Sequence, residues 1–291
     1  MSAYPEDLRA LVEDHLAALR FSRAPATGGL EEAMRYSVLA GGKRVRPVLA
    51  LASGRAIGTE PSELLPAAAA IELIHTHSLI PDALPAMDDD ELRRGRPTSH
   101  VVHGEDVAIL AGDGLFAEAV SLFAREQPGE PGRVLAALRE LVDATGAAGM
   151  VGGQYVDVTA DAQGVDADRL RELHSLKTGR LIAASVTIPL LLGGIAEDAT
   201  IPYRHFAEEL GVLFQIVDDI LDVTGTDEQL GKPHGSDERH GKVTYVSLYG
   251  LERARELAGE SHAKAVAALD EAGPATDDLR RVTDFIHTRQ T

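Results

Sequence analysis

Two groups of aspartate residues stand far apart in the sequence, and basic residues follow each group. The first consists of Asp82 and residues 88–90, and the second of Asp218, Asp219 and Asp222. Carboxylate oxygens are the ligands that Mg²⁺ prefers, while guanidinium and ammonium groups bind phosphate oxygens. A single acidic run is more often the solvated start of a helix. Two such groups with ordered basic partners favour a site that holds several divalent cations over a diphosphate.

The spacing of the second group fits one helix face. Asp218 and Asp222 are separated by four positions, so an α-helix places their Cβ atoms about 5–6 Å apart, while Asp219 lies on an adjacent face and could bind through water. All three lie in an apolar stretch, where a carboxylate is costly unless it is paired or bound to metal. In the first group Pro85 must interrupt the helix, so helical geometry does not place Asp82 relative to Asp88.

Helical periodicity extends over nearly the whole chain, and alternating β-patterned runs are almost absent. The apolar residues from Leu8 to Leu19 recur at spacings of three and four, with Pro5 suited to the first turn of their helix. We predict an all-α, single-domain helical bundle over residues 1–291, with two central apolar helices that bring both acidic groups to one cavity. The further predicted helices are 29–40, 44–57, 62–80, 105–126, 132–161, 166–194, 202–224 and 236–259.

Composition excludes several classes of protein. The chain has no cysteine, which excludes disulfides and thiolate sites, and its net charge of −18 disfavours non-specific binding of nucleic acid. No uninterrupted apolar run approaches 18 residues, so we expect no membrane span. The first residues lack a secretory signal, and we therefore expect a cytoplasmic protein. An anionic substrate must meet a local cluster of basic residues.

The lysines provide part of such a cluster. The chain has only five, at positions 43, 177, 232, 242 and 264, and the first four lie in motifs described below. Because an ammonium acts as a point charge whereas Arg grips two oxygens in a planar fork, a site with both types could bind two different diphosphates.

Residues 78–98 resemble the first aspartate-rich motif of the trans-polyprenyl diphosphate synthases, the family of short-chain farnesyl and geranylgeranyl diphosphate synthases. The Pro85-Ala86 pair between the aspartates resembles the bacterial and plant form of this motif. Other motifs similar to those of the family follow in order. They are 41–47 (GGKRVRP), 74–76 (IHT), 152–154 (GGQ), 177–179 (KTG), 214–222 (FQIVDDILD), 231–237 (GKPHGSD) and 242–245 (KVTY).

The resemblance implies a fold of the isoprenoid synthase type with a central cavity, and a homodimer. It also implies a Mg²⁺-dependent prenyltransferase that condenses isopentenyl diphosphate with allylic diphosphates. Three Mg²⁺ ions would be held by Asp82, Asp88, Asp218 and Asp222. The rest of the allylic diphosphate shell would be Arg93, Lys177, Gln215, Lys232 and Lys242. The isopentenyl diphosphate would be bound by Lys43, Arg46, His75 and Arg94. Thr178 and Gln215 would direct oxygen dipoles toward the allylic cation.

The resemblance also indicates which residues set product length. In this family the side chain of the fifth residue before the first motif forms the bottom of the product pocket. Here that residue is His77, which is smaller than the Tyr or Phe usual in farnesyl-type enzymes. Phe116, on the predicted helix 105–126, is a second candidate for the floor. We expect products of C15 to C20.

Two positions depart from the family pattern. Pro81 and Ala83 stand where the family has His and Asp, so we predict a competent enzyme with slower turnover or a higher demand for metal. Restoring Asp at position 83 and His at position 81 should then raise turnover. One alternative is a regulatory subunit that binds prenyl diphosphates without turnover. A class I terpene cyclase is less favoured, because it would need an Asn/Ser/Glu metal triad where this chain has the second aspartate group.

Overall fold

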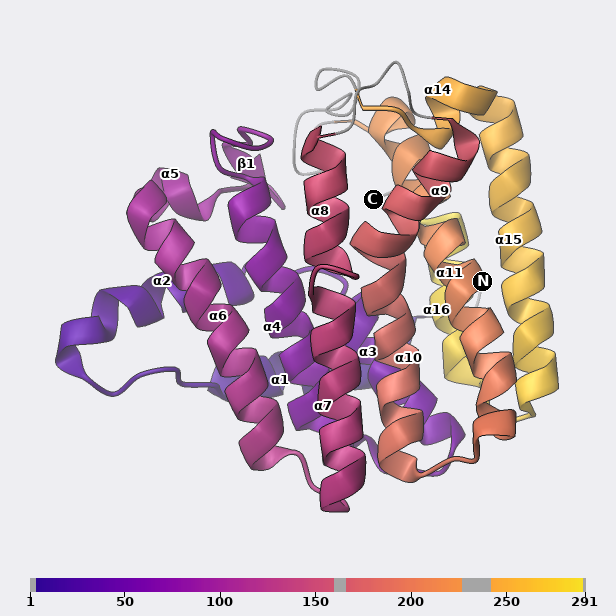
Figure 1. The fold of residues 1–291 in the computed structure, drawn as a ribbon, viewed down its shortest axis with the longest axis horizontal. Helices are drawn as coiled ribbons and strands as arrows, with labels where there is room; N and C mark the ends of the chain where they lie inside the picture. Colours follow the sequence, from indigo (N-terminus) through magenta and orange to yellow (C-terminus); the bar gives the residue numbers. More distant parts are fainter. Residues whose placement is uncertain (1–3, 160–165, 227–241, 290–291) are drawn as a thin grey trace.

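Helices make up almost all of the regular structure in the computed structural model, which describes residues 4–159, 166–226 and 242–289 (Figure 1). The all-α prediction is confirmed. The helices up to residue 126 are α1 (Glu6–Ala18), α2 (Gly28–Val38), α3 (Val45–Ala56), α4 (Leu65–Asp82), α5 (Ser99–His103) and α6 (Glu105–Glu126). Those beyond are α7 (Pro131–Thr145), α8 (Met150–Thr159), α9 (Ala167–His174), α10 (Arg180–Gly193), α11 (Glu197–Thr224), α14 (Tyr245–Tyr249), α15 (Leu251–Ala272) and α16 (Asp277–Thr288). Short helical turns are η1 (Pro25–Thr27), η2 (Pro61–Leu64) and η4 (Ser175–Gly179).

The core forms around the two helices that carry the aspartate groups. α4 packs mainly on α6 and α3, and α11 packs mainly on α15 and α10. A run of small residues, 67–70, is buried on α4 and is followed by the fully buried Ile71. Small side chains let neighbouring helices approach closely without leaving voids. One buried apolar cluster includes residues from α1 through α16.

The expected helix 132–161 is wrong as a single element. α7 ends at Thr145 and α8 begins at Met150, with Gly146 in extended conformation as the C-cap of α7. Glycine has little helix propensity, and three residues later Gly149 interrupts the same stretch. The helical spacing of apolar residues continues across this break because both helices bury one face against the same core.

Two more boundaries differ from those expected. α11 begins at Glu197 rather than at 202. The acidic side chains of Glu197 and Asp198 interact favourably with the positive end of the helix dipole. Pro202 lies inside the helix, which loses one backbone hydrogen bond there. In the described part of 236–259, Gly250 at φ +80° separates α14 from α15. That left-handed conformation is readily adopted only by glycine.

Several elements were not predicted from the sequence. They include α5, α16 and a small hairpin of β1 (Leu92–Arg93) and β2 (Arg96–Pro97). The hairpin turns at Arg94 and Gly95, which both have positive φ, at 54° and 70°. Two residues with positive φ match the twist of a tight hairpin. The first of them is an arginine that the sequence assigned to the substrate site.

Two helical stretches, Glu105–Glu126 and Ala167–Gly193, are long and apolar enough to cross a membrane by length and composition alone. The sequence led us to expect no span. α6 packs against α4, α2 and α5, and α10 packs against α7, α3 and α11. Interior helices of a bundle have the same composition as spanning helices, so this observation is weak support for a membrane span.

Glycines allow close contacts between the elements that carry the site. A Cβ at Gly153 would lie 2.3 Å from the backbone nitrogen of Lys177, and one at Gly211 would lie 3.2 Å from the Cα of Gly179. Real Cβ atoms essentially never approach another atom to 2.3 Å, and 3.2 Å is tighter than most of their contacts, so α8 and α11 both pack directly on η4.

We predict that Gly153→Ala destabilises the fold by about 1–3 kcal/mol, because the added methyl group must push α8 away from η4. The control is Gly259→Ala in α15, where nothing lies within 4 Å of the added Cβ. This change should stabilise the fold by up to about 1 kcal/mol, the difference in helix propensity. Urea unfolding measures both, and equal effects of the two substitutions would contradict the close contact at η4.

Candidate functional site

One cavity of about 420 Å³ lies between the C-terminal end of α4, α8, η4, α11 and the segment before α14. Twelve of the residues predicted for the site line it. They are Arg46, His75, Asp82, Asp88, Arg93, Arg94, Lys177, Thr178, Gln215, Asp218, Asp222 and Lys242. Lys43, His77 and Phe116 do not line this cavity, and Lys232 lies outside the described residues.

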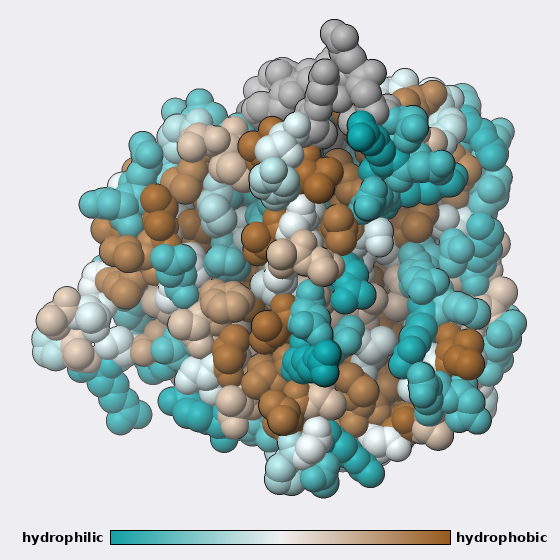
Figure 2. Space-filling view, viewed as in Figure 1, coloured by the Kyte–Doolittle hydropathy of each residue, from teal (hydrophilic) through white to brown (hydrophobic). Residues whose placement is uncertain are grey.

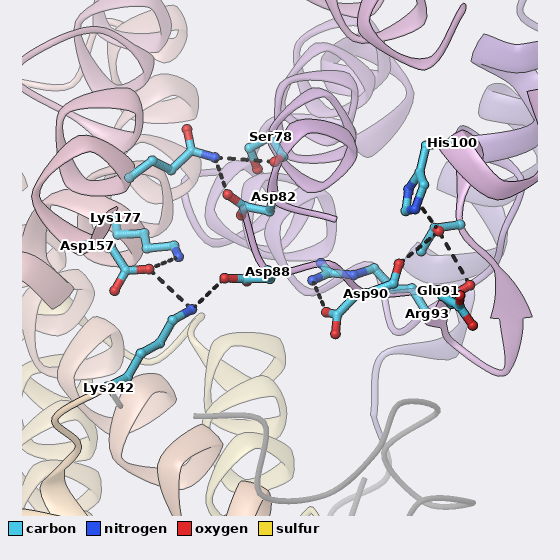
Figure 3. Close-up of polar contacts among 12 residues, drawn as sticks. Ser78, Asp82, Asp88, Asp90, Glu91, Arg93, His100, Asp157, Lys177 and Lys242 are labelled. Carbon is cyan, nitrogen blue, oxygen red and sulfur yellow. Dashed lines mark hydrogen bonds and ion pairs between the residues drawn. The ribbon is translucent and has the colours of Figure 1, made fainter. Parts of the chain in front are cut away.

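Asp82 is the last residue of α4, and the chain then turns back on itself. The backbone N–H of Asp88 donates to the carbonyl of Asp82 at 2.9 Å, which places the second carboxylate beside the first. Asp82 is buried, and the side-chain amide of Gln154 donates to its Oδ1 at 2.8 Å and to the Ser78 carbonyl at 3.2 Å (Figure 3). The third residue of the 152–154 motif thus orients the first carboxylate.

Alternating acidic and basic groups connect the first aspartate group to η4 (Figure 3). Lys242 Nζ donates to Asp88 at 2.9 Å and lies 3.4 Å from Asp157, which also accepts from Lys177 at 2.7 Å. Burial alone would raise the pKa of Asp157, but Lys177 and Lys242 outweigh that effect and lower it. Sequence reasoning missed Asp157, although its position three residues after Gln154 on a helix was a usable signal.

In the second group the three aspartates differ in their surroundings. Asp219 is buried at 2% exposure, and its two oxygens accept from the Gln215 side chain at 3.0 Å and from the backbone N–H of Tyr245 at 2.7 Å. Asp219 therefore anchors the start of α14. Asp218 and Asp222 line the cavity from the same helix.

Arg289, just beyond α16, enters the site from the C-terminal end of the chain. Its guanidinium donates to Asp218 at 2.5 Å and lies 4.4 Å from the centroid of the Phe214 ring. Arg46 lies 5.5 Å from the centroid of the same ring. Sequence reasoning missed Arg289 because α16 was not predicted, and nothing in the sequence connects position 289 to Asp218.

The turn η4 is π-helical and presents Lys177 and Thr178 to the cavity. A π-turn adds one residue to the helix and rotates the following side chains, a feature frequent at functional sites. The Thr178 hydroxyl donates to Gln215 Oε1 at 3.0 Å. The pair thus links η4 to α11 and places two polar side chains at the wall of the cavity.

Basic residues line the part of the cavity near the start of α3. The Arg46 guanidinium and His75 Nε2 lie 3.3 Å apart. Burial and the neighbouring arginines, Arg46 first, hold the pKa of His75 well below 6.5, so the ring is neutral and accepts from Arg46. Burial also lowers the pKa of Arg46 to about 10. Arg46 nevertheless remains a cation at neutral pH.

Gly42 makes room for Arg94. The guanidinium carbon of Arg94 would lie 2.7 Å from a Cβ at Gly42, and Arg94 donates to the carbonyl of Gly41. Gly42 also has φ +124°, a conformation that L-residues rarely adopt. In this structure Gly42 thus admits a cationic side chain. Arg44 is buried between Glu13 and Glu72 and therefore has a structural role.

The remaining predicted residues lie away from this cavity. The Lys43 side chain is exposed, with Nζ 5.5 Å from the centroid of the Phe285 ring. His77 and Phe116 contact one another, with ring centroids 5.6 Å apart, and His77 Nδ1 lies 2.9 Å from the carbonyl of Gly112. These two residues join α4 to α6 one to two turns before the first aspartate group.

The aspartates at the cavity could bind hard divalent cations together with ligands from water or from substrate phosphates. Within the described ranges, no three His, Asp or Glu side chains already form a metal site. Asp82 and Asp88 line the same cavity as Asp218 and Asp222, and all of these ligands are oxygens. Oxygen atoms suit Mg²⁺, which keeps several of its ligands from water or from substrate phosphates.

Comparison with known proteins finds relatives that match most of the chain. The family model for polyprenyl synthetase matches residues 28–282. The chain is 47% identical over 242 residues, 81% of its length, to the heterodimeric geranylgeranyl pyrophosphate synthase large subunit 1 of Arabidopsis thaliana, and covers 65% of that protein. It is 46% identical over 244 residues, 83% of its length, to the geranylgeranyl pyrophosphate synthase of Capsicum annuum, and covers 66% of it. The chain thus spans just under two thirds of these relatives.

Solved structures match over almost the full chain. A geranyltransferase from Helicobacter pylori, complexed with magnesium and isoprenyl diphosphate, superposes with a TM-score of 0.85 at 32% identity, covering 97% of this chain and 94% of that one. A farnesyl/geranylfarnesyl diphosphate synthase from Zymomonas mobilis gives a TM-score of 0.83 at 33% identity, with 97% and 95% covered.

The cavity also predicts how stability depends on pH. Burial lowers the pKa of His174 to about 4 from the usual 6.5. Between these values the unfolded chain binds a proton that the folded chain does not, so stability falls as the pH falls from 6.5 toward 4. This group alone should remove about 2 kcal/mol between pH 7.5 and pH 5.

His174→Gln should abolish that part of the pH dependence, whereas His205→Gln, at an exposed histidine of α11, should leave it unchanged. Urea unfolding at the two pH values measures the difference. Equal pH dependence in the wild type and His174→Gln would contradict a buried, neutral His174.

Proposed function

We propose, from the premise that the chain belongs to the polyprenyl synthetase family, that it is a trans-prenyltransferase. It would condense isopentenyl diphosphate with an allylic diphosphate to form short-chain prenyl diphosphates of C15 to C20. One observation carries this proposal: two aspartate pairs line the same cavity. Asp82 and Asp88 come from the end of α4 and the turn after it, Asp218 and Asp222 come from α11, and cationic side chains line the cavity beside them. This arrangement suits two diphosphates and several divalent cations.

The chemistry begins when the allylic C–O bond breaks and negative charge develops on the departing diphosphate. Lys177 and Lys242 are held by Asp157 and line the cavity, where their ammonium groups would stabilise that charge. Arg93 would join this shell, as would Lys232 by resemblance. The oxygens of Thr178 and Gln215 would face the allylic cation. Isopentenyl diphosphate then forms the new carbon–carbon bond and loses a proton, for which the released diphosphate is the base.

Magnesium is the metal that this ligand set favours. Bound Mg²⁺ would neutralise the diphosphate and raise its leaving-group ability. The four carboxylates, Asp82, Asp88, Asp218 and Asp222, would hold it, and we propose three ions. For this to occur, Lys242 must share or release Asp88, and Arg289 must do the same for Asp218.

The second diphosphate would be held by Arg46, His75 and Arg94, at the part of the cavity near the start of α3. A neutral His75 that accepts from Arg46 keeps the guanidinium in place without adding a second charge. Lys43, whose exposed side chain lies outside the cavity, would join them only after a rearrangement of its long side chain. This basic set separates the proposal from a class I terpene cyclase, which has a single diphosphate to bind.

The departures at positions 81 and 83 do not remove a group from the cavity. Pro81 lies in the last turn of α4, where the helix is about to end, and Ala83 does not line the cavity. The alternative of a non-catalytic subunit is therefore not favoured. The effect of the two residues on turnover remains our proposal, with the restored double variant as its test.

We also propose a homodimer of single-domain chains. Exposed apolar residues gather on neighbouring helices, and Figure 2 shows hydrophobic residues over α6, α7 and α8. The exposed apolar residues on α5, α6, α7 and α8 are Val101, Val102, Ile109, Leu110, Leu135, Val142, Val151, Tyr155 and Val158. Exposed apolar patches of this kind mark interaction surfaces. Because one relative is named as a subunit of a heterodimer, sedimentation of the chain alone is the informative measurement.

For the compartment we propose the cytoplasm. The plant relatives are named as chloroplastic, which describes those proteins. Fractionation of the native cell, followed by detection of the chain, tests the proposal, and recovery with a plastid fraction would contradict it.

The first prediction of function concerns the carboxylates. Asp82→Asn and Asp218→Asn should each lower turnover at saturating Mg²⁺ by at least about 100-fold, because each would remove a metal ligand that acts on the leaving group. Asp113→Asn, at an exposed aspartate of α6, is the control and should retain wild-type turnover. Labelled isopentenyl diphosphate with each allylic starter measures the rates. Activity of Asp218→Asn within fivefold of the wild type would rule out its role as a ligand.

The second concerns product length. His77 and Phe116 do not line the cavity, but they pack between α4 and α6, where we propose that the growing prenyl chain extends. His77→Tyr should therefore shorten the products by reducing this space, and Phe116→Ala should lengthen them by opening it. Chromatography of dephosphorylated products measures both. Wild-type products of C30 or longer, or of C10 alone, would contradict the proposed range.

A further inference from the structure

A second, smaller cavity lies behind the wall of the first. It has a volume of about 50 Å³ and is lined by residues of α2, the end of α4, the β1–β2 hairpin and the start of α5. Leu79, Arg93 and Arg94 line both cavities and form the wall between them. Ala83 lines only the smaller one and is buried at 2% exposure. Anything bound there would lie against residues of the proposed substrate site.

The charges around this cavity are unbalanced. Three arginines line it, Arg93, Arg94 and Arg96, and none of the described residues in its lining is acidic. Arg93 forms an ion pair with Asp90 at 3.7 Å, although Asp90 does not line the cavity. Arg96 stacks over the Tyr36 ring at 4.6 Å. Guanidinium groups gathered around an uncharged hollow repel one another, and an anion placed among them would relieve that repulsion.

Two buried polar atoms at the cavity can bind such an anion. Within the described part of the chain, the hydroxyl of Ser99 and Nε of Arg93 have no hydrogen-bond partner. Ser99 is 7% exposed and lines the cavity. A buried donor without an acceptor is unfavourable by about 1–3 kcal/mol. Arg93 Nε can only donate and the Ser99 hydroxyl can donate, so a ligand that accepts from both would satisfy them.

The remaining lining limits the size and shape of that acceptor. Leu79, Ile80 and Ala83 add apolar side chains to the lining that holds the arginines. A site for one water needs about 10–15 Å³ of such volume, so this cavity suits a ligand of about three to five heavy atoms. A diphosphate is too large. A short carboxylate has the required charge, acceptor oxygens and small apolar end.

We propose that this cavity is a binding site for a small carboxylate such as formate or acetate. Its oxygens would accept from Ser99 Oγ and from the guanidinium groups of Arg93 and Arg96, with the apolar end against Ala83. The site shares Arg93 and Arg94 with the wall of the diphosphate cavity, but its occupation needs neither metal nor prenyl substrate. The proposal therefore stands or falls independently of the proposed catalytic activity.

The experiment titrates the purified, metal-free chain with sodium formate or sodium acetate at constant ionic strength, with sodium chloride as the balancing salt. We expect a saturable rise in Tm of about 3 °C at 100 mM carboxylate. Saturation-transfer NMR on the acetate methyl group reports binding directly. No response, or an equal response to added chloride at low ionic strength, would overturn the proposal.

Substitutions locate the response. Ser99→Ala should weaken carboxylate binding at least fivefold, because it removes a donor. The matched control is Ser53→Ala, at a buried serine of α3 whose hydroxyl also lacks a partner among the described residues, and it should leave binding unchanged. Equal weakening in both, or in neither, would overturn the assignment to this cavity.

Filling the cavity provides a second test. Ala83→Asp places a carboxylate among the same arginines and should abolish the response to formate, whereas Ala83→Val should abolish it by volume alone. Should Ala83→Asp fail to fold, Ala83→Val and the NMR measurement on Ser99→Ala still decide the question. A full formate response in either folded Ala83 variant would contradict the proposal.

Discussion

The structure depends on hydrogen-bond and ion-pair partners that balance the negative charge of carboxylates. The fold places these carboxylates in or beside an apolar interior. Asp82 ends the nearly fully buried helix α4, and Asp222 is only 4% exposed on α11. Such groups are stable only when paired or hydrogen-bonded. Distant elements supply partners for the aspartates at the cavity: Gln154 for the buried Asp82, and Lys242 and Arg289 for the more exposed Asp88 and Asp218. A protein of net charge −18 thus gathers its cations where an anionic substrate would bind.

Irregular backbone brings these groups together. The π-turn η4 presents Lys177 and Thr178, the hairpin turn places Arg94 at positive φ, and the turn after α4 places Asp89 at positive φ. The π-turn and the turn after α4 depart from helix geometry, the hairpin turn holds a non-glycine residue at positive φ, and each lies at the wall of one cavity or next to it. Unfavourable backbone conformations persist when the surrounding packing fixes them, and they concentrate at functional sites. Glycines 42, 153 and 211 make the close contacts possible.

The sequence predicted the helical class, most of the helices and twelve of the residues that line the cavity. Periodicity and spacing sufficed for Asp218 and Asp222, because one helix fixes their relation. They failed at 132–161, where two helices share one buried face, and at α16, which was not recognised. Residues such as Asp157 and Arg289 were missed because their roles arise from tertiary contacts with Lys177 and Asp218, which no local pattern encodes. Chemical motifs are local in sequence, whereas the groups that balance their charge are not.

The central claim is that the carboxylates of α4 and α11 act on the same metal ions. The most direct measurement is anomalous diffraction from crystals grown with Mn²⁺ and an unreactive allylic thiodiphosphate. The account predicts anomalous peaks on both sides of the diphosphate within one cavity, with Asp82 or Asp88 bound on one side and Asp218 or Asp222 on the other. Peaks confined to one aspartate group, with the other still paired to its lysine or arginine, would contradict it.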